Sequence, residues 1–185
     1  MARHARTSLA ACNVGIAKND FEGGVVMHNG KRTDKLQHAT ITLRHSYSAP
    51  LERVFSEFAD PVARASWSSP SNDELFYDEA DFRIGGKDVF RCGPKGNPKF
   101  RGETRYLDIV PNARVVSSET VDADGQRLAV ALATLNFDPT DDGTNLTVTI
   151  QMVSFVGADM IHAYESGNKS ALKNLSVHLS HIRSA

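Results

Sequence analysis

Three polar residues near the start of the last predicted helix carry the groups best placed for chemistry. Tyr164 and Asn168 fall on the apolar stripe of a helix predicted over 158–182, and Glu165 lies about 60° from that stripe. Ligand pockets set a few polar groups into apolar walls, so these side chains could orient a bound molecule. In the structural alternative, Tyr164 packs in the core with its hydroxyl at the rim, and Asn168 bonds nearby sheet groups or water. Both interpretations stay open at this point.

Large apolar side chains supply the other candidates for a binding site. Trp67, the only tryptophan, follows two short predicted helices, where it could wall a cavity or pack the helix corner against the sheet. Phe90, Tyr106 and Met152 could add ligand contacts, although core packing is the commoner role for such side chains. The predicted ligand-binding residues are Trp67, Phe90, Tyr106, Met152, Tyr164 and Asn168.

The residues that could act in catalysis or bind a metal ion do not match a known catalytic or metal-binding motif. His178 and His181 have the spacing of helical metal ligands, but they lie about 80° and 140° from the apolar stripe and should diverge toward solvent. Cys92 has no adjacent histidine or helix N-terminus to activate its thiol. Gly85-Gly86 favours a tight strand turn over a phosphate loop. We therefore predict no catalytic residue, no metal ion and no cofactor.

Strand arginines offer one further recognition group. Arg91 or Arg105, if it pointed inward, could hold a carboxylate through two parallel hydrogen bonds. Arginine is seldom fully buried, so we expect these side chains, with those of Arg83 and Arg101, to face solvent.

The elements that must position these residues follow from periodicity. Alternation predicts a strand at 39–47, and apolar residues at 3/4 spacing predict a helix over 51–59. A short helix at 62–65 precedes a meander of six strands, near 76–84, 88–92, 100–109, 113–121, 127–137 and 146–152. The apolar face of such a sheet must be covered, and only the helix over 158–182 is long enough. We predict an α+β domain whose curved antiparallel sheet wraps that helix, with the two short helices closing one end.

Charge divides the chain into two parts. Residues 1–37 hold six Lys and Arg against three Asp and Glu, a net charge of +3, whereas the whole chain of 185 residues carries −1, which leaves −4 for the remainder. This stretch also lacks an apolar period, so we predict an irregular N-terminal extension at 1–37 and one domain at 38–185. A targeting segment or a translation start at Met27 are the alternatives for the extension.

Composition narrows the possible partners and location. The near-zero net charge disfavours a nucleic-acid binder, which needs clustered Lys and Arg, and no run reaches the roughly 18 apolar residues of a membrane span. The two cysteines cannot form a disulfide framework. We therefore expect a cytoplasmic protein, monomeric or homodimeric, without a nucleic-acid partner.

Motifs spread over about 38–185 resemble those of a known group. The order of elements is similar to the helix-grip fold of the START-like (SRPBCC) superfamily, and the local motifs resemble homologues of the heat shock protein 90 ATPase activator. The matching residues are Ala49-Pro50, Val54-Phe55, Asp60-Pro61, Trp67, Arg83, Gly85, Gly86, Phe90, Gly102, Asp108, Pro111, Gly167, Leu172, Leu175 and Leu179. Asn168 stands where the group usually has Trp.

This resemblance implies a small apolar cavity between sheet and helix, used for lipids, polyketides, hormones or other apolar ligands. It also implies that many members have no catalytic activity. Our expectation is a binder of a small apolar molecule, and the lack of catalytic motifs favours a role without catalysis. The alternatives are a polyketide cyclase- or aromatase-like enzyme, or a co-chaperone-type module that contacts a chaperone ATPase.

Overall fold

The computed structural model describes residues 36–69 and 72–182. The predicted extension at 1–37 lies outside the described residues except for its last two, and the second of these already begins the first strand. In chain order the elements are β1 (Gln37–Tyr47), α1 (Leu51–Ala59), α2 (Pro61–Ser68), β2 (Asp73–Ala80), β3 (Lys87–Pro94), β4 (Phe100–Val110), β5 (Arg114–Ala123), β6 (Gln126–Thr140), β7 (Gly143–Ser154) and α3 (Ala158–Ile182).

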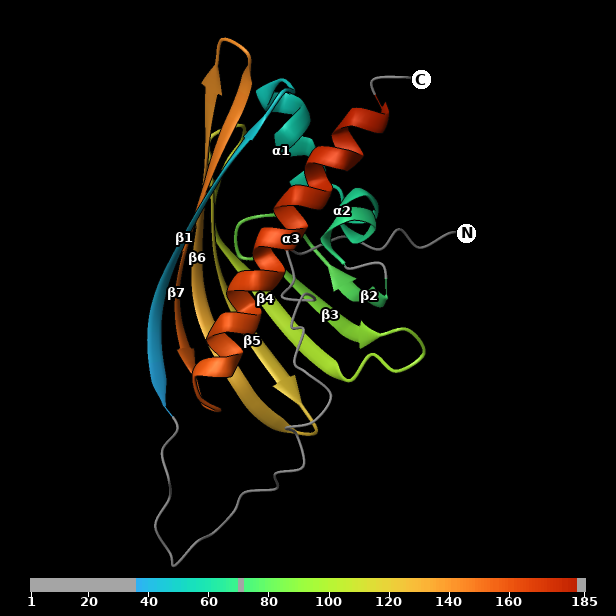
Figure 1. Ribbon diagram of the computed structural model, residues 1–185, viewed down its shortest axis with the longest axis vertical. Helices are drawn as coiled ribbons and strands as arrows, with labels where there is room; N and C mark the ends of the chain where they lie inside the picture. The colour runs from blue at the N-terminus through green and yellow to red at the C-terminus, as the bar shows by residue number, and fades with distance from the viewer. Residues whose placement is uncertain (1–35, 70–71, 183–185) are drawn as a thin grey trace, which may run out of the picture.

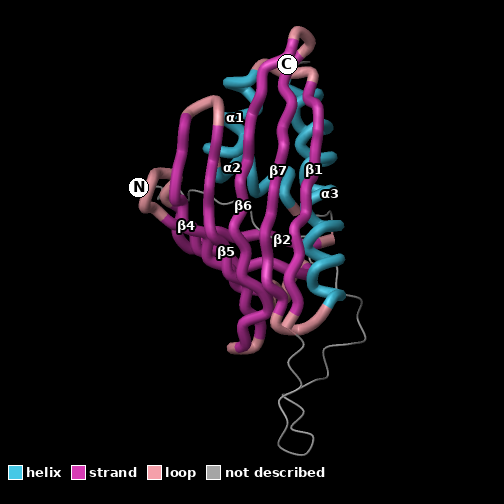
Figure 2. The backbone as a smooth tube through the Cα atoms, turned by 90° about the vertical axis from the view of Figure 1, so that its left-hand side faces the viewer, coloured by secondary structure: helices cyan, strands magenta, loops and turns pink. Residues whose placement is uncertain are grey.

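The seven strands form one antiparallel sheet in the order β1-β7-β6-β5-β4-β3-β2 (Figure 1). Consecutive strands from β2 to β7 are neighbours, which is the predicted meander, and β1 closes the order by pairing with β7. All three helices lie on one side of the sheet (Figure 2). The α+β helix-grip architecture is therefore confirmed, because the long α3 packs across the face that the strands curve around.

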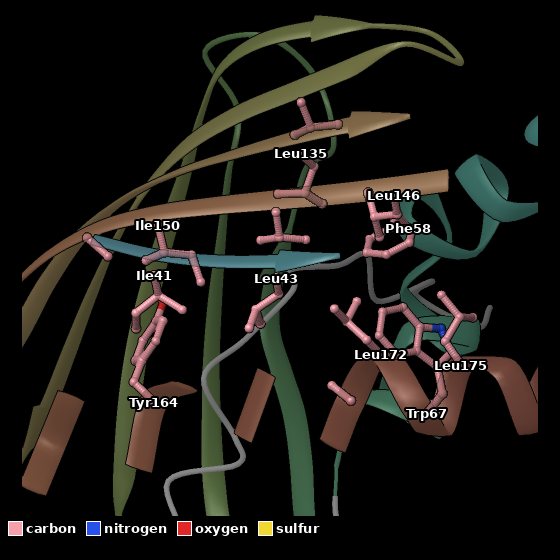
Figure 3. Close-up of a cluster of buried hydrophobic side chains, with 14 of the residues drawn as sticks. Ile41, Leu43, Phe58, Trp67, Leu135, Leu146, Ile150, Tyr164, Leu172 and Leu175 are labelled. Carbon is pink, nitrogen blue, oxygen red and sulfur yellow. The ribbon is translucent and has the colours of Figure 1, made fainter. Parts of the chain in front are cut away.

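Helix α3 buries the stripe that the sequence predicts. Tyr164, Leu172, Leu175 and Leu179 are buried, while Asn168 is half-buried. Opposite α3, the sheet contributes a continuous apolar surface (Figure 3) that includes Ile41, Leu43, Leu135, Leu146 and Ile150.

Within the described residues, no helix has the length and apolarity needed to cross a membrane.

Helix α2 is longer than predicted, because it runs from Pro61 to Ser68 rather than over 62–65. The Asp60 carboxylate accepts hydrogen bonds from the backbone N–H groups of Val62 (2.8 Å) and Ala63 (3.3 Å), and proline suits the first helical turn. The additional turn is stabilised because it buries Trp67 against the core. The longer α2 also carries a charged residue, Arg64, into the interior.

The predicted strand near 76–84 ends earlier, at Ala80. A turn over 81–86 follows it, in which Gly85 adopts a φ of 77°, a left-handed conformation that favours glycine. The Gly85 N–H donates to the Tyr106 carbonyl oxygen (2.8 Å), and the Asp81 N–H donates to Asp88 Oδ1 (3.0 Å). These bonds fix the turn, and with it Phe82, against β3 and β4.

Candidate functional site

Five polar side chains form a buried band across the face of the sheet that the helices cover. Asp88 comes from β3, Thr104 and Tyr106 from β4, and Ser117 and Glu119 from β5, and all five are buried. The register pairs Asp88 with Thr104, Thr104 with Glu119, and Tyr106 with Ser117. Because strand side chains alternate between faces, the members that lie two residues apart on β4 and on β5 face the same side of the sheet.

Arg64 of α2 reaches this polar band from the helix layer. Its side chain is only 1% exposed, and its Nη1 donates to the Tyr106 hydroxyl (3.2 Å). That hydroxyl in turn donates to Asp88 Oδ2, so the three groups form a chain from α2 to β3. The guanidinium carbon also lies 5.8 Å from the centre of the Phe82 ring. Among the described residues, Arg64 Nε and Nη2 have no hydrogen-bond partner.

Burial determines which groups in this series of hydrogen bonds are ionised. Removal from water raises the pKa of Asp88 to about 6, although the Arg64 charge and the Tyr106 hydrogen bond act in the opposite direction. Burial likewise raises the pKa of Tyr106 far above its usual value, so this phenol stays protonated and donates. Among Arg64, Tyr106 and Asp88, it is therefore Asp88 that can exchange a proton near neutral pH.

A second polar contact links the sheet to α3. The Tyr164 hydroxyl donates to Glu119 Oε1 (2.6 Å), and the Thr104 hydroxyl donates to Glu119 Oε2 (3.0 Å). Burial, together with the Glu119 carboxylate, raises the pKa of Tyr164 well above its usual value. Asn168 Nδ2 donates to the Tyr164 carbonyl oxygen (2.9 Å) within the helix. The Tyr164 hydroxyl therefore lies in the interior, and Asn168 is bonded to the backbone of its own helix.

A cavity of about 20 Å³ lies between α2 and the sheet. A space of that size holds about one water molecule. Its lining combines four apolar side chains with four polar ones, namely Phe58, Phe82, Val115 and Leu135 with Arg64, Thr104, Tyr106 and Ser117. Seven of these residues are buried, whereas Phe82 is half-buried. Phe82 is therefore the one lining residue that is partly exposed to solvent.

Tyr106 is the one predicted ligand-binding residue that lines this cavity. Trp67 is buried next to the lining residue Phe58, and the two rings meet edge-on at 5.1 Å between centroids (Figure 3). The Trp67 Nε1 has no hydrogen-bond partner within the described part of the chain. Phe90 is fully buried across Gly102, where an added Cβ would lie 1.9 Å from the ring. Met152, Tyr164 and Asn168 lie elsewhere; Met152 and Tyr164 are buried, and Asn168 is half-buried.

The charged residues of the cavity region were not singled out from the sequence. Arg64 and Trp67 lie three residues apart on the buried face of α2. A prediction that started this helix at Pro61 and continued it to Trp67 would have placed both residues on that face. Asp88 shares a strand face with Phe90 and Cys92, again by simple alternation. The strand arginines, by contrast, are exposed as expected, with Arg91 paired to Asp78 and Arg105 to Glu103.

The prediction that both helical histidines face solvent is wrong for one of them. His178 is half-buried, and its Nε2 lies 3.0 Å from Oε2 of the buried Glu57 on α1. Its Nδ1 is 3.4 Å from the Ser66 hydroxyl on α2. The cause is that α1 and α2 pack against the flank of α3, which a helical projection of α3 alone does not include. His181 is exposed. Over 36–69 and 72–182, no three His, Cys, Asp or Glu side chains are grouped to hold a metal ion.

Comparisons with known proteins agree with this architecture. The Mll3558 protein from Rhizobium loti is 32% identical, with a TM-score of 0.70, and the match covers 77% of this chain and 98% of that one. A protein from Rhizobium leguminosarum is 27% identical (TM-score 0.68; 79% and 97% covered), and protein CV1439 from Chromobacterium violaceum is 28% identical (TM-score 0.66; 75% and 94% covered). No curated protein matches the sequence.

The sequence itself also matches a family model. The model described as activator of Hsp90 ATPase homolog 1-like protein covers residues 48–180, from the end of β1 almost to the end of α3. The chain therefore belongs to the family of activator of Hsp90 ATPase homolog 1-like proteins, within the START-like (SRPBCC) superfamily.

Proposed function

We propose that this domain binds a small, largely apolar organic molecule in the cavity between α2 and the sheet. The observation that carries this proposal is the mixed lining, in which four apolar side chains surround a buried arginine, a tyrosine and two hydroxyl residues. Apolar walls supply binding free energy, and a few convergent polar groups supply orientation. A core built for stability alone would not require an arginine with unused donors, because such donors destabilise the folded state.

Phe82 provides the route by which a ligand reaches this space. Its ring packs edge-on against Tyr106 (4.9 Å between centroids) and Phe55 (6.1 Å), and the residue is only half-buried, so part of it is exposed to solvent. Rotation of this side chain joins the cavity to solvent and adds the volume of a phenyl ring. The bound state in this proposal is therefore an enlarged form of the cavity, with Phe82 turned outward.

This role fits the geometry better than the two alternatives from the family resemblance. A co-chaperone module would place its recognition groups on the surface, whereas Arg64, Tyr106 and Ser117 are interior. A cyclase-like enzyme needs an acid or base within reach of its substrate. Asp88, the group that titrates near neutral pH, is screened from the cavity by the Tyr106 hydroxyl that bonds to it.

A fragment screen tests the proposal. Small apolar molecules with one polar end are added to the whole chain, and binding is followed by thermal shift and by amide chemical shifts. Ligands should raise the melting temperature, because a ligand at 100 times its Kd stabilises by about 2.7 kcal/mol. The amide shifts should centre on Thr104, Tyr106 and Ser117.

Two phenylalanine variants provide the matched comparison. Phe82→Ala removes the cavity wall and should change fragment affinity several-fold, whereas Phe76→Ala, on the exposed side of β2, should leave it unchanged. The proposal fails if no fragment binds, or if amide shifts gather away from the cavity and both variants behave alike.

A further inference from the structure

We propose that Arg64 binds the carboxylate of an acidic ligand through its two adjacent donors, Nε and Nη2. This inference rests on the proposed function and names the ligand class: small monocarboxylic acids with an aromatic or branched aliphatic body. The donors Nε and Nη2 point along one edge of the planar guanidinium, and that edge matches the two oxygens of a carboxylate.

The free donors of Arg64 are the main support. The side chain is 1% exposed and lines the cavity, and its third nitrogen, Nη1, is already bonded to Tyr106 (3.2 Å). Nε and Nη2 have no partner within the described residues. Buried donors without partners are unfavourable, so a group that accepts from both is strongly preferred. A planar carboxylate offers two acceptor oxygens at the matching separation.

The neighbouring residues hold this edge in place. Tyr106 fixes the other side of the guanidinium, and its hydroxyl is in turn held by Asp88. The Phe82 ring lies against the guanidinium carbon at 5.8 Å. Tyr106, Asp88 and Phe82 are positioning residues in this scheme, and Arg64 is the residue that touches the ligand.

Charge balance makes carboxylate binding sensitive to pH. Asp88 faces Arg64 from β3. The other titratable groups near Asp88 are Tyr106 on β4 and Asp81 in the turn before β3, and Glu119 of β5 lies beyond Thr104. When a ligand carboxylate pairs with Arg64, Asp88 loses its share of that positive charge and takes up a proton from solvent. Acidic ligands should therefore bind more tightly as the pH falls.

The apolar part of the ligand follows from the walls. Phe58, Phe82, Val115 and Leu135 surround the polar groups, so a ring or branched chain fits next to the carboxylate. One arginine provides one such edge, which favours a single carboxylate over a dicarboxylate.

Matched pairs of acids and neutral analogues provide the test. Benzoate, phenylacetate and 4-methylpentanoate are each compared with the corresponding primary amide by titration calorimetry on the whole chain. At pH 6.5 each acid should bind about tenfold more tightly than its amide, as expected for hydrogen bonds to a charged group. Arg64→Lys keeps the charge but loses the paired donors, and should reduce this preference severalfold.

Asp88→Asn is the second variant, because it leaves Arg64 in place. Wild-type affinity for the acids should fall by up to about tenfold per pH unit above the Asp88 pKa of about 6, as expected when one proton is bound with the ligand. In Asp88→Asn the affinity should be higher at pH 8 and nearly independent of pH. Asp78→Asn, on the exposed side of β2, is the control and should keep the wild-type profile.

The outcomes separate this inference from the proposed function. If acids and amides bind equally well and Asp88→Asn leaves the pH profile unchanged, the carboxylate site is wrong while ligand binding stands. If neither acids nor amides bind, both proposals fail. A preference for acids that is lost in Arg64→Lys, together with a flat profile in Asp88→Asn, supports the carboxylate site.

Discussion

Replacing Asp88 by Asn should change how the stability of this protein depends on pH. The folded-state pKa of Asp88 is about 6, whereas the ordinary value is 3.8. The folded protein therefore binds more protons than the unfolded chain between these pH values, and stability falls as the pH rises through them. At about 1.4 kcal/mol per pKa unit, ionising Asp88 in the folded state lowers the free energy of unfolding by about 3 kcal/mol.

Urea denaturation followed by tryptophan fluorescence measures this effect, since Trp67 is the only tryptophan and is buried. The free energy of unfolding of the wild type minus that of Asp88→Asn should decrease by most of this amount, about 3 kcal/mol, between about pH 4 and pH 7.5.

Asp78→Asn is a control of opposite sign. Hydrogen bonds from Arg91 hold the pKa of Asp78 below its usual value. Its contribution to stability is therefore lost only as the pH falls below its ordinary value of 3.8, so the wild-type advantage over Asp78→Asn should grow with pH up to about pH 4 and stay nearly constant from there to pH 7.5. Parallel stability curves for wild type and Asp88→Asn across this range would refute the reasoning about Asp88.

Three further changes test the packing around the site by urea denaturation. Gly102→Ala should destabilise by about 1–3 kcal/mol, because its Cβ would lie 1.9 Å from the Phe90 ring; a smaller effect in a Phe90→Leu background would confirm the clash. Asp60→Ala should cost about 1 kcal/mol by removing the α2 cap, and an unchanged midpoint would contradict the assigned cap. Glu57→Gln should cost about 1–3 kcal/mol, and this cost should shrink in a His178→Ala background if their contact is real.

Much of the fold could be predicted because it follows from local periodicity. The 3/4 spacing in α1 and α3 and the alternation in β1 and β7 identify the buried faces without knowledge of their partners. The errors came where local signals were weak. The end of β2 and the extent of α2 depend on contacts made by Asp88 and Trp67 with segments distant in space.

The candidate site was predictable only in part. Tyr106 was chosen as a large side chain on an inward strand face, and it does line the cavity. The burial of Arg64 could not be predicted from the sequence, because it is stabilised by Tyr106 and the charge of Asp88, which lie on two different strands. The strand register that aligns Asp88 with Thr104 and Glu119 is not encoded in any single segment.

The sequence by itself determined the order of elements, the apolar faces of the strands and of α3, and the family to which the chain belongs. The tertiary structure alone decided which charged side chains are buried, because a charge enters the core only where partners from other elements stabilise it. Arg64 meets Tyr106 and Asp88 in this way, and His178 meets Glu57. Such partners are brought together by the tertiary structure alone, since their positions along the chain do not reveal their distances in space.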